Sequence, residues 1–405
     1  MLEVVTMQQA SEAIDSAFGH LRTSAREVGL DAACGLVLAR DIVAPEGIPP
    51  FDRSTVDGYA LHASDTFGCS EALPALLHRA GSILMGEPAT QPCDPGTCWA
   101  IPTGGEVPAG ADAVVMVEHT EDFGDGTIGI LSSVAPGTNL IYRHDDVAPG
   151  HTLCHAGQAL AAHHVGALAS LGITRVQALA PVRVGILSTG DEIVPADATP
   201  QGAQMRDVNG PLLASAVRAC GGEGVHLGIV PDEADALEAA VAEACSTCDV
   251  VLVSGGSSVG QRDATSTVFG KLGTILLHGI AMKPGKPTLV TRLGDTPAFG
   301  LPGHPLAAYF VFLEFVRPLL LAMQGIAEGG VPTRAASLTQ AVPSNHGRAE
   351  CVAVHVEEGP EGLRATPVRS KSGLMSLLSQ ASGYIVVPRD TEGLAIGTPV
   401  QVKPF

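Results

Sequence analysis

Two lysines stand three residues apart in a stiff turn, Lys283-Pro-Gly-Lys286-Pro. The prolines restrict the backbone, so the two ammonium groups project from a segment with little conformational freedom. The chain has a formal net charge of −19, from 23 basic and 42 acidic residues, and its overall field therefore repels anions. In such a chain a local pair of lysines indicates a binding site for a phosphate or another oxyanion.

Two glycine-containing loops could contribute backbone contacts to the same anion. The loop Ser254-Gly-Gly-Ser-Ser-Val-Gly260 follows a predicted buried strand and can turn its N–H groups toward a ligand, although tight turning alone also explains its glycines. The segment Leu301-Pro-Gly-His304-Pro305 begins a predicted helix whose free N–H groups suit a second contact. The expected ligand contacts in these loops are Gly255, Gly256, Ser257, Gly260, Pro302, Gly303 and His304.

Three carboxylates lie near these loops in the predicted domain. Asp191 and Glu192 end the segment Ser188-Thr-Gly-Asp-Glu192, and paired carboxylates of this kind can hold a divalent cation through oxygen. A solvated turn is the alternative for this pair. Asp263 precedes a predicted helix, where it could cap the helix, bind a ligand, or do both. The sequence therefore offers Asp191, Glu192 and Asp263 as a metal-binding set.

The elements that would position these residues alternate between strand and helix from 180 to 325. Predicted strands at 182–187, 225–230 and 249–253 are separated by helical patterns at 210–219 and after Asp232. This order predicts right-handed βαβ units on a parallel sheet covered by helices on both faces. Ligands bind such sheets beyond the carboxyl ends of the strands, where the loops above begin.

The flanking segments predict three further domains. A capping box at Thr6–Gln9 begins an amphipathic helix, and a strand is expected at 36–43. The chain from there to about 146 is β-like, and 149–172 predicts a short strand and a helix. We therefore expect a multidomain α/β protein with an elongated N-terminal domain (1–50 and 147–178), an inserted β domain (51–146), a central α/β domain (179–326) and a C-terminal β-barrel domain (327–405).

Composition excludes several classes of function. The excess of acidic residues argues against binding to nucleic acid and to anionic membranes. The N-terminus lacks the pattern of a signal peptide, and the longest apolar run, 306–323, contains Glu314, Arg317 and Pro318, so we expect a core helix in a cytoplasmic protein. The nine scattered cysteines and the lone Cys245-Ser-Thr-Cys248 pair predict reduced thiols rather than a zinc site. His151 and His155 lie in a predicted short strand bracketed by Gly150 and Gly157, and we do not expect them to form a metal site.

The sequence resembles the MoeA family of molybdopterin molybdenumtransferases, which includes the E domain of gephyrin. The resemblance covers nearly the whole chain. It rests on the segments 50–60 (Pro-Phe-Asp-Arg-Ser-Thr-Val-Asp-Gly-Tyr-Ala), 101–105 (Ile-Pro-Thr-Gly-Gly), 108–115, 188–192, 254–260 and 283–287.

The resemblance implies a central domain with the molybdopterin-binding fold in an L-shaped homodimer. It also implies a pocket between that domain and the partner's inserted domain. The implied reaction consumes adenylylated molybdopterin and molybdate with Mg²⁺, and releases AMP and molybdenum cofactor. Implied partners are the adenylylating enzyme of the pathway and the apoproteins that receive the cofactor. The implied catalytic positions are Asp57, Glu192, Asp263, Lys283 and Lys286, and the implied substrate-binding positions also include Thr103, Asp146, Ser188, Thr189, Gly190, Asp232, Arg348 and Ser376.

Two positions depart from the family pattern, and other functions stay open at this point. His304 stands where the family usually has Asn, and Gly279 stands where some members have a further lysine. A receptor-clustering scaffold of the gephyrin type is one alternative, although a scaffold has no need of the full carboxylate and lysine set. A pterin or nucleotide enzyme that shares only the α/β domain, as competence-damage-inducible proteins do, is another. Tungstate could replace molybdate, because the two anions are nearly the same size and charge.

Overall fold

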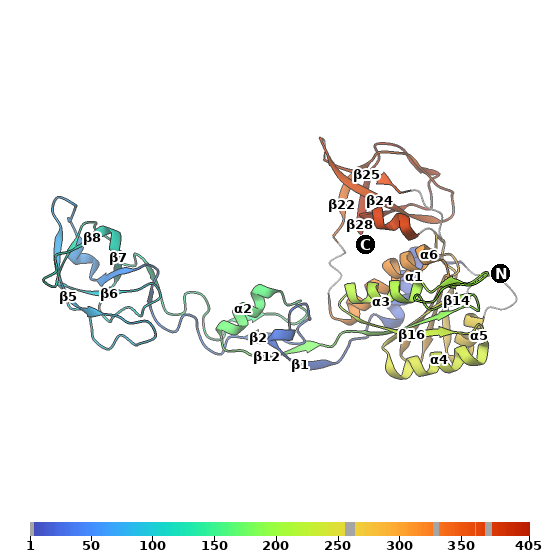
Figure 1. Cartoon of the computed structure of the whole chain (residues 1–405), viewed down its shortest axis with the longest axis horizontal. Helices are drawn as coiled ribbons and strands as arrows, with labels where there is room; N and C mark the ends of the chain where they lie inside the picture. Colours follow the sequence, from blue (N-terminus) through green and yellow to red (C-terminus); the bar gives the residue numbers. More distant parts are fainter. Residues whose placement is uncertain (1–3, 256–263, 327–331, 361, 369–374) are drawn as a thin grey trace.

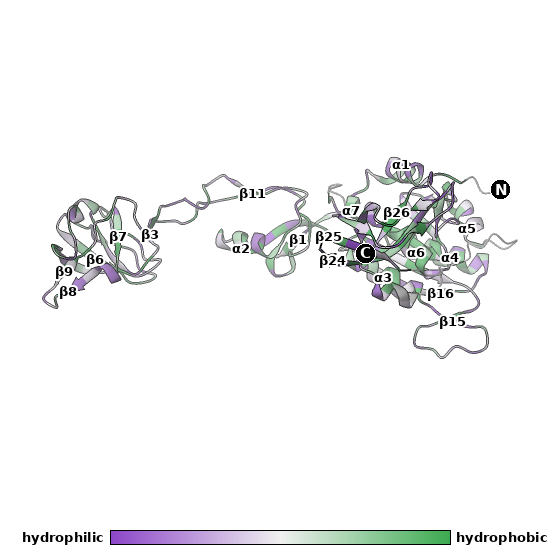
Figure 2. Ribbon diagram, turned by 90° about the horizontal axis from the view of Figure 1, so that it is seen from above, coloured by the Kyte–Doolittle hydropathy of each residue, from purple (hydrophilic) through white to green (hydrophobic). Residues whose placement is uncertain are grey.

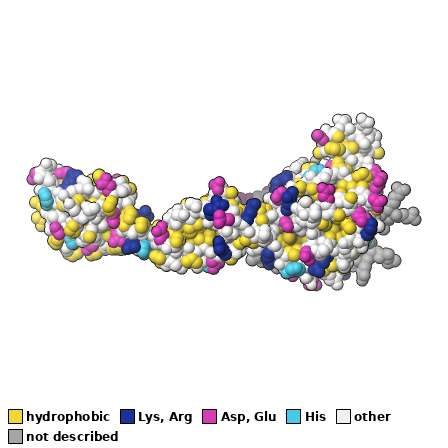
Figure 3. Space-filling model, turned by 90° about the horizontal axis from the view of Figure 1, so that it is seen from below, with side chains coloured by type: hydrophobic (Ala, Val, Ile, Leu, Met, Phe, Trp, Pro, Cys, Tyr) yellow, Lys and Arg dark blue, Asp and Glu magenta, His cyan; other side chains and the backbone are white. Residues whose placement is uncertain are grey.

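The computed structural model describes residues 4–255, 264–326, 332–360, 362–368 and 375–405. The molecule is elongated, with the inserted β domain at one end and the α/β and C-terminal domains at the other (Figure 1). The same order is seen from above (Figure 2), and a narrow neck joins the inserted domain to the rest of the surface (Figure 3). Both ends of the chain lie at the end of the molecule opposite the inserted domain (Figure 1).

The elongated part is built from outgoing and returning segments that pair antiparallel. Its strand pairs are β1 (Ala25–Gly29) with β12 (Arg175–Leu179), β2 (Ile42–Val43) with β11 (Thr152–Cys154), and β3 (Arg53–Ser54) with β10 (Leu140–Ile141). The helix predicted within 149–172 is confirmed as α2 (Ala162–Ser170), and the short 3-10 helix η1 (Leu30–Ala32) contributes to the same apolar cluster.

The prediction of one strand at 36–43 is wrong. Only its last two residues form β2, while Val37 and Leu38 make single bridges to two different segments, at Ala159 and Ala178. Because consecutive residues pair with different partners, no continuous ladder can form.

The inserted domain is a β domain, as predicted. Its six-stranded sheet has the order β7-β4-β6-β5-β9-β8, and the strand β4, which is second in this order, is buried along its whole length. Apolar clusters cover both faces of that strand, one around Tyr59 and Leu61 and the other around Ala60. The elements are β4 (Gly58–Leu61), η2 (Ala63–Thr66), β5 (Ala75–Ser82), β6 (Thr97–Ile101), β7 (Ala113–Met116), η3 (Val117–His119), β8 (Thr120–Asp122) and β9 (Thr127–Ile130).

The central sheet has the order β16-β13-β17-β21-β20-β18, and its first four strands are parallel. The strand β20 pairs antiparallel with both β21 and β18, so it alone runs against the other five, which differs from the all-parallel expectation. A two-residue turn at Gly294 and Asp295 joins β20 to β21, and a connection that short allows only antiparallel pairing. The strands are β13 (Arg183–Thr189), β16 (Glu223–Val230), β17 (Val250–Ser254), β18 (Thr274–His278), β20 (Leu289–Leu293) and β21 (Thr296–Leu301).

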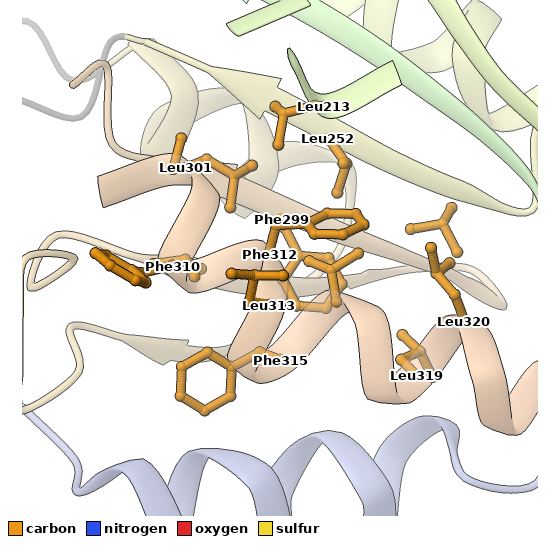
Figure 4. Packing of buried hydrophobic residues seen from close by; sticks show 14 of the residues in the cluster. Leu213, Leu252, Phe299, Leu301, Phe310, Phe312, Leu313, Phe315, Leu319 and Leu320 are labelled. Carbon is orange, nitrogen blue, oxygen red and sulfur yellow. The ribbon is translucent and has the colours of Figure 1, made fainter. Parts of the chain in front are cut away.

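Helices cover both faces of this sheet and make three layers, as predicted. Alternate residues of β17 point to opposite faces, so Leu252 joins the cluster with α3 and α6–α7, whereas Val251 and Val253 pack against α4 and α5. Figure 4 shows Leu252, Phe299 and Phe312 in the centre of the first cluster. The helices are α1 (Met7–Phe18), α3 (Asn209–Ala219), α4 (Ala234–Thr247), α5 (Ala264–Leu272), α6 (Pro305–Val311), the π-helical turn η4 (Phe312–Val316) and α7 (Arg317–Met323).

Helix α1 belongs to the α/β domain by packing, although the sequence placed residues 1–50 in the elongated domain. The capping box is confirmed: Gln9 N donates to Thr6 Oγ1 at 3.1 Å and Thr6 N donates to Gln9 Oε1 at 2.9 Å. The apolar face of the helix carries Ala10, Ile14 and Phe18 into the cluster beside α7. Burial of this face therefore decides where the helix lies.

The continuous segment Pro305–Met323 is a core helix, and 72% of its most apolar window is buried in the protein. It is long and apolar enough to span a membrane, but its burial explains that composition. Its Glu314 is paired: the carboxylate accepts a hydrogen bond from Tyr384 Oη at 2.6 Å and lies 2.8 Å from Lys403 Nζ.

The C-terminal domain is a small closed β-barrel, as predicted. The strands pair in the cycle β24-β25-β22-β28-β26, and a pairing of β26 with β24 closes it. One strand of the α/β domain, β19 (Met282–Lys283), adds to the edge of β24. The remaining elements are β22 (Arg334–Leu338), β23 (Val342–Pro343), β24 (Ala349–Gly359), β25 (Gly362–Pro367), η5 (Met375–Gln380), β26 (Gly383–Val387), β27 (Gly393–Leu394) and β28 (Pro399–Pro404).

Candidate functional site

A cavity of about 800 Å³ lies at the carboxyl ends of β13, β17 and β21. This volume is within the range of small-molecule sites. A loop with the short strands β14 (Ile193–Val194) and β15 (Met205–Arg206) borders the cavity and projects from the domain (Figure 2). The predicted site residues that line the cavity are Ser188, Thr189, Gly190, Glu192, Asp232, Gly255, Pro302, Gly303 and His304.

A buried carboxylate organises one wall of the cavity. Asp207, only 4% exposed, accepts hydrogen bonds through Oδ1 from Ser188 Oγ at 2.9 Å and from Gly210 N at 3.0 Å. Its Oδ2 atom lies 3.0 Å from His226 Nε2. A Cβ atom on Gly210 would lie 2.3 Å from His226 Nε2, so this arrangement requires glycine at the start of α3. Asp207 thus joins β13, α3 and β16.

A buried amide joins the other two strand ends. Asn209 Nδ2 donates to Ser254 Oγ at 2.5 Å and to the carbonyl of Gly303 at 2.9 Å. Its Oδ1 atom and the hydroxyl of Thr189 are buried and have no hydrogen-bond partner within the described ranges. Because both residues line the cavity, a bound ligand could satisfy these two atoms.

The backbone at Gly255 makes close contact with the end of β13. Its φ is +117°, and a Cβ atom there would lie 2.0 Å from the carbonyl oxygen of Thr189. Only glycine avoids both the unfavourable conformation and the clash. This requirement applies to the first glycine of the predicted loop. Gly256, Ser257, Gly260 and Asp263 lie outside the described residues.

Two of the predicted carboxylates face the cavity and a third supports it. Glu192 and Asp232 line the cavity, whereas Asp191 lies beside it and accepts a hydrogen bond from Asp232 N at 3.2 Å. Within the described part of the chain, no three His, Cys, Asp or Glu side chains form a metal-binding cluster. Mg²⁺ is usually held by one or two carboxylates together with substrate phosphates, and Glu192 and Asp232 fit that mode.

The lysine turn lies between two cavities rather than inside one. Lys286 is exposed and directly precedes Pro287, which lines the first cavity. Lys283 lines a second cavity of about 730 Å³ between the α/β domain and the barrel. There its Nζ atom lies 2.9 Å from Glu350 Oε1, so this ammonium is already paired with a carboxylate.

The inserted domain lies at the far end of the molecule from the α/β domain that holds the first cavity (Figure 1). Thr103 donates to Asp57 Oδ1 from its backbone N at 2.6 Å and from Oγ1 at 3.0 Å. The backbone donor, followed by the hydroxyl, lowers the pKa of Asp57 below its usual value. Asp146 is exposed, and its backbone N donates to the Ile48 carbonyl at 3.0 Å. One chain therefore cannot bring these residues to its own cavity.

Two predicted substrate-binding residues belong to the barrel, and the cysteines were predicted to have no binding role. Arg348 and Ser376 are exposed, and neither lines either cavity. Burial raises the pKa of the Cys245 thiol, and all nine cysteines are free, which agrees with the prediction of reduced thiols.

Arg206, Asp207, Asn209 and Ser254 line the cavity but were not predicted as site residues. Ser254 begins the predicted glycine loop, and the signal for the other three residues was the segment Arg206-Asp-Val-Asn209 directly before a helical pattern. Polar residues at such a position are ordinarily read as helix caps, and their role in joining three strand ends depends on the fold.

The fold and the cavity define a class of protein, an α/β domain of the molybdopterin-binding type within a four-part chain. Models of known families match the "MoeA N-terminal region (domain I and II)" at residues 5–172, a "Probable molybdopterin binding domain" at 185–322 and the "MoeA C-terminal region (domain IV)" at 335–405. The chain belongs to the MoeA family of molybdopterin molybdenumtransferases.

Named relatives and solved structures match over nearly full length. The chain is similar to molybdopterin molybdenumtransferase 2 of Mycobacterium tuberculosis, with 33% identity over 93% of this chain and 94% of that one. It is similar to the molybdopterin molybdenumtransferase of Haemophilus influenzae, with 31% identity over 95% and 94% of the two chains. Two crystal structures of the molybdopterin biosynthesis protein MoeA of Pyrococcus horikoshii each give a TM-score of 0.86, at 35% and 30% identity, over 99% and 100% of both chains.

Proposed function

We propose that the protein inserts molybdenum from molybdate into adenylylated molybdopterin and releases AMP and molybdenum cofactor. The observation that carries this proposal is the cavity at the strand ends, which Glu192 and Asp232 line together with Gly255 and Gly303. Backbone amides and hydroxyls suit phosphate oxygens, and the unpartnered amide oxygen of Asn209 suits an N–H donor of a ring system.

The charges of the site match a reaction between two anions. Mg²⁺ held by Glu192 and Asp232 would neutralise the charge that develops on phosphate oxygens. Lys286, beside the cavity, and Lys283, which lines the second cavity, would hold oxyanions. The other residues that line the cavity would bind and orient the two substrates. The proposed reaction requires no protein nucleophile.

The site would be completed in a homodimer. Asp57, Thr103 and Asp146 are exposed, and the inserted domain lies at the end of the molecule opposite the α/β domain (Figure 1), so we expect them to act on the cavity of a second copy. Closed two-fold symmetry would give two such composite sites. The proposed setting is the cytoplasm, with the adenylylating enzyme as the source of substrate and apoproteins as acceptors of the cofactor.

The direct test supplies purified protein with adenylylated molybdopterin, Mg²⁺ and molybdate, and measures AMP release. Molybdate-dependent release is expected, and its absence would refute the proposed reaction. Glu192→Gln and Lys286→Ala should each reduce the rate; normal rates in both would leave the reaction standing and refute these site assignments. A parallel series with tungstate measures the preference between the two anions.

A mixed dimer tests the composite site. Asp57→Ala and Glu192→Gln homodimers should both be nearly inactive, because each lacks one half of every site. A heterodimer of the two variants has one intact site, so it should recover about half of the native rate. No recovery, although the heterodimer forms, would refute the proposal that the site is shared between subunits.

A further inference from the structure

The lysine turn is part of the joint between the α/β domain and the barrel. Strand β19 pairs in parallel with β24, with Met282 opposite Ala349 and Lys283 opposite Glu350. Ala349 N also donates to the Ala281 carbonyl at 2.9 Å. The barrel therefore holds the backbone of the turn in a fixed register, and the neighbour of Lys283 across this joint is a carboxylate.

That carboxylate is held in place on both oxygens. Glu350 Oε1 lies 2.9 Å from Lys283 Nζ, and Oε2 accepts a hydrogen bond from Ser344 Oγ at 2.8 Å. The Glu350 side chain is 16% exposed and that of Lys283 is 48% exposed, so the carboxylate is the better buried partner. Apolar side chains, including Phe310 and Val352, line the cavity around the pair. Such a lining strengthens the attraction relative to water.

We infer that Glu350 competes with the oxyanion for Lys283, so that oxyanion binding requires Glu350 to release this lysine. The inference rests on the proposed function, which gives Lys283 an anionic ligand. A carboxylate and a tetrahedral oxyanion offer the same kind of oxygen acceptor to an ammonium group. Because Glu350 lies on a barrel strand, the exchange removes one contact that holds the barrel to the α/β domain. Anion binding is thereby coupled to this domain joint.

Molybdate alone, titrated calorimetrically into the full chain, is the probe. Glu350→Gln removes the competing charge but keeps the strand pairing and an acceptor for Ser344. We expect it to bind molybdate about three- to tenfold more tightly than the native chain. Glu358→Gln is the matched control, because Glu358 is exposed on the same strand and carries the same charge. A distant, screened charge should change the affinity by less than about twofold. Equal gains in the two variants, or no gain in Glu350→Gln, would overturn the inference.

Two further variants separate competition from a structural role. Glu350→Asp keeps the charge on the strand but shortens its reach, so it should also bind molybdate more tightly than the native chain, and unchanged affinity would contradict the inference. In a Lys283→Ala background, Glu350→Gln should give no gain. A gain there would show that the competition does not act through Lys283. If Glu350→Gln binds more tightly but no variant releases AMP, the inference stands and the proposed reaction fails.

Discussion

Replacement of Asp207 by alanine should destabilise the α/β domain selectively. The change removes a carboxylate that is 4% exposed, accepts two hydrogen bonds and lies 3.0 Å from His226 Nε2. A hydrogen bond to a charged group contributes about 1.5–3 kcal/mol, and a donor left buried without a partner adds a cost. Removal of the carboxylate also removes the free-energy cost of burying its charge, which offsets part of this loss. We expect the free energy of unfolding to fall by about 3 kcal/mol, and by about 1–2 kcal/mol for Asp207→Asn, which keeps one acceptor oxygen.

The assay must distinguish the domains, because a chain of several domains does not unfold in one step. Hydrogen exchange of β13 and α3 reports the α/β domain, whereas the single tryptophan, Trp99, lies in β6 and reports the inserted domain. Protection of β13 and α3 should fall while the fluorescence transition of Trp99 stays unchanged.

A matched control is Asp249→Ala, which removes an exposed carboxylate that accepts a hydrogen bond from Arg183 N at 2.8 Å. Its cost should stay below about 1 kcal/mol, because an exposed donor regains water. The reasoning would be refuted if Asp207→Ala cost no more than this control, or if the inserted domain lost as much stability as the α/β domain.

Three more outcomes are expected. Gly255→Ala should cost more than about 3 kcal/mol and abolish ligand binding, because its φ is +117° and its Cβ would lie 2.0 Å from a backbone oxygen; an unchanged thermal midpoint would contradict this. In a thiol-labelling experiment at pH 8, exposed Cys34 should react and Cys98 should not, because burial raises the pKa of Cys98 to about 12; mass spectrometry locates the label. The stabilising contribution of Asp57, whose folded pKa is lowered, is present above its unfolded pKa and is lost as pH falls through the folded value. Carbon-detected NMR should show this low pKa and a partial rise in Thr103→Ala, which keeps the stronger backbone donor; no rise would contradict the assignment.

The oxyanion-binding role predicted for Lys283 shows where sequence reasoning about the site reached its limit. The spacing of the two lysines correctly indicated a constrained turn, and both residues are exposed to some extent. The partner of Lys283, however, comes from a distant segment: Glu350 meets this lysine only because β24 pairs with β19 at its edge. Nothing in the local pattern around either residue specifies that pairing.

The sequence by itself determined the local elements and the loops that follow them. Alternate apolar residues of β17 pack against helices on opposite faces of the sheet. The predicted loops directly follow β13, β17 and β21, so chain order alone places these loops at the strand ends. Tertiary structure decided which side chains hold those ends together. Asp207 and Asn209 read as helix caps along the chain, and they become the supports of the cavity because packing brings Ser188, Ser254 and Gly303 to them. Periodicity is a local property of the chain, whereas these contacts depend on the pairing of distant segments.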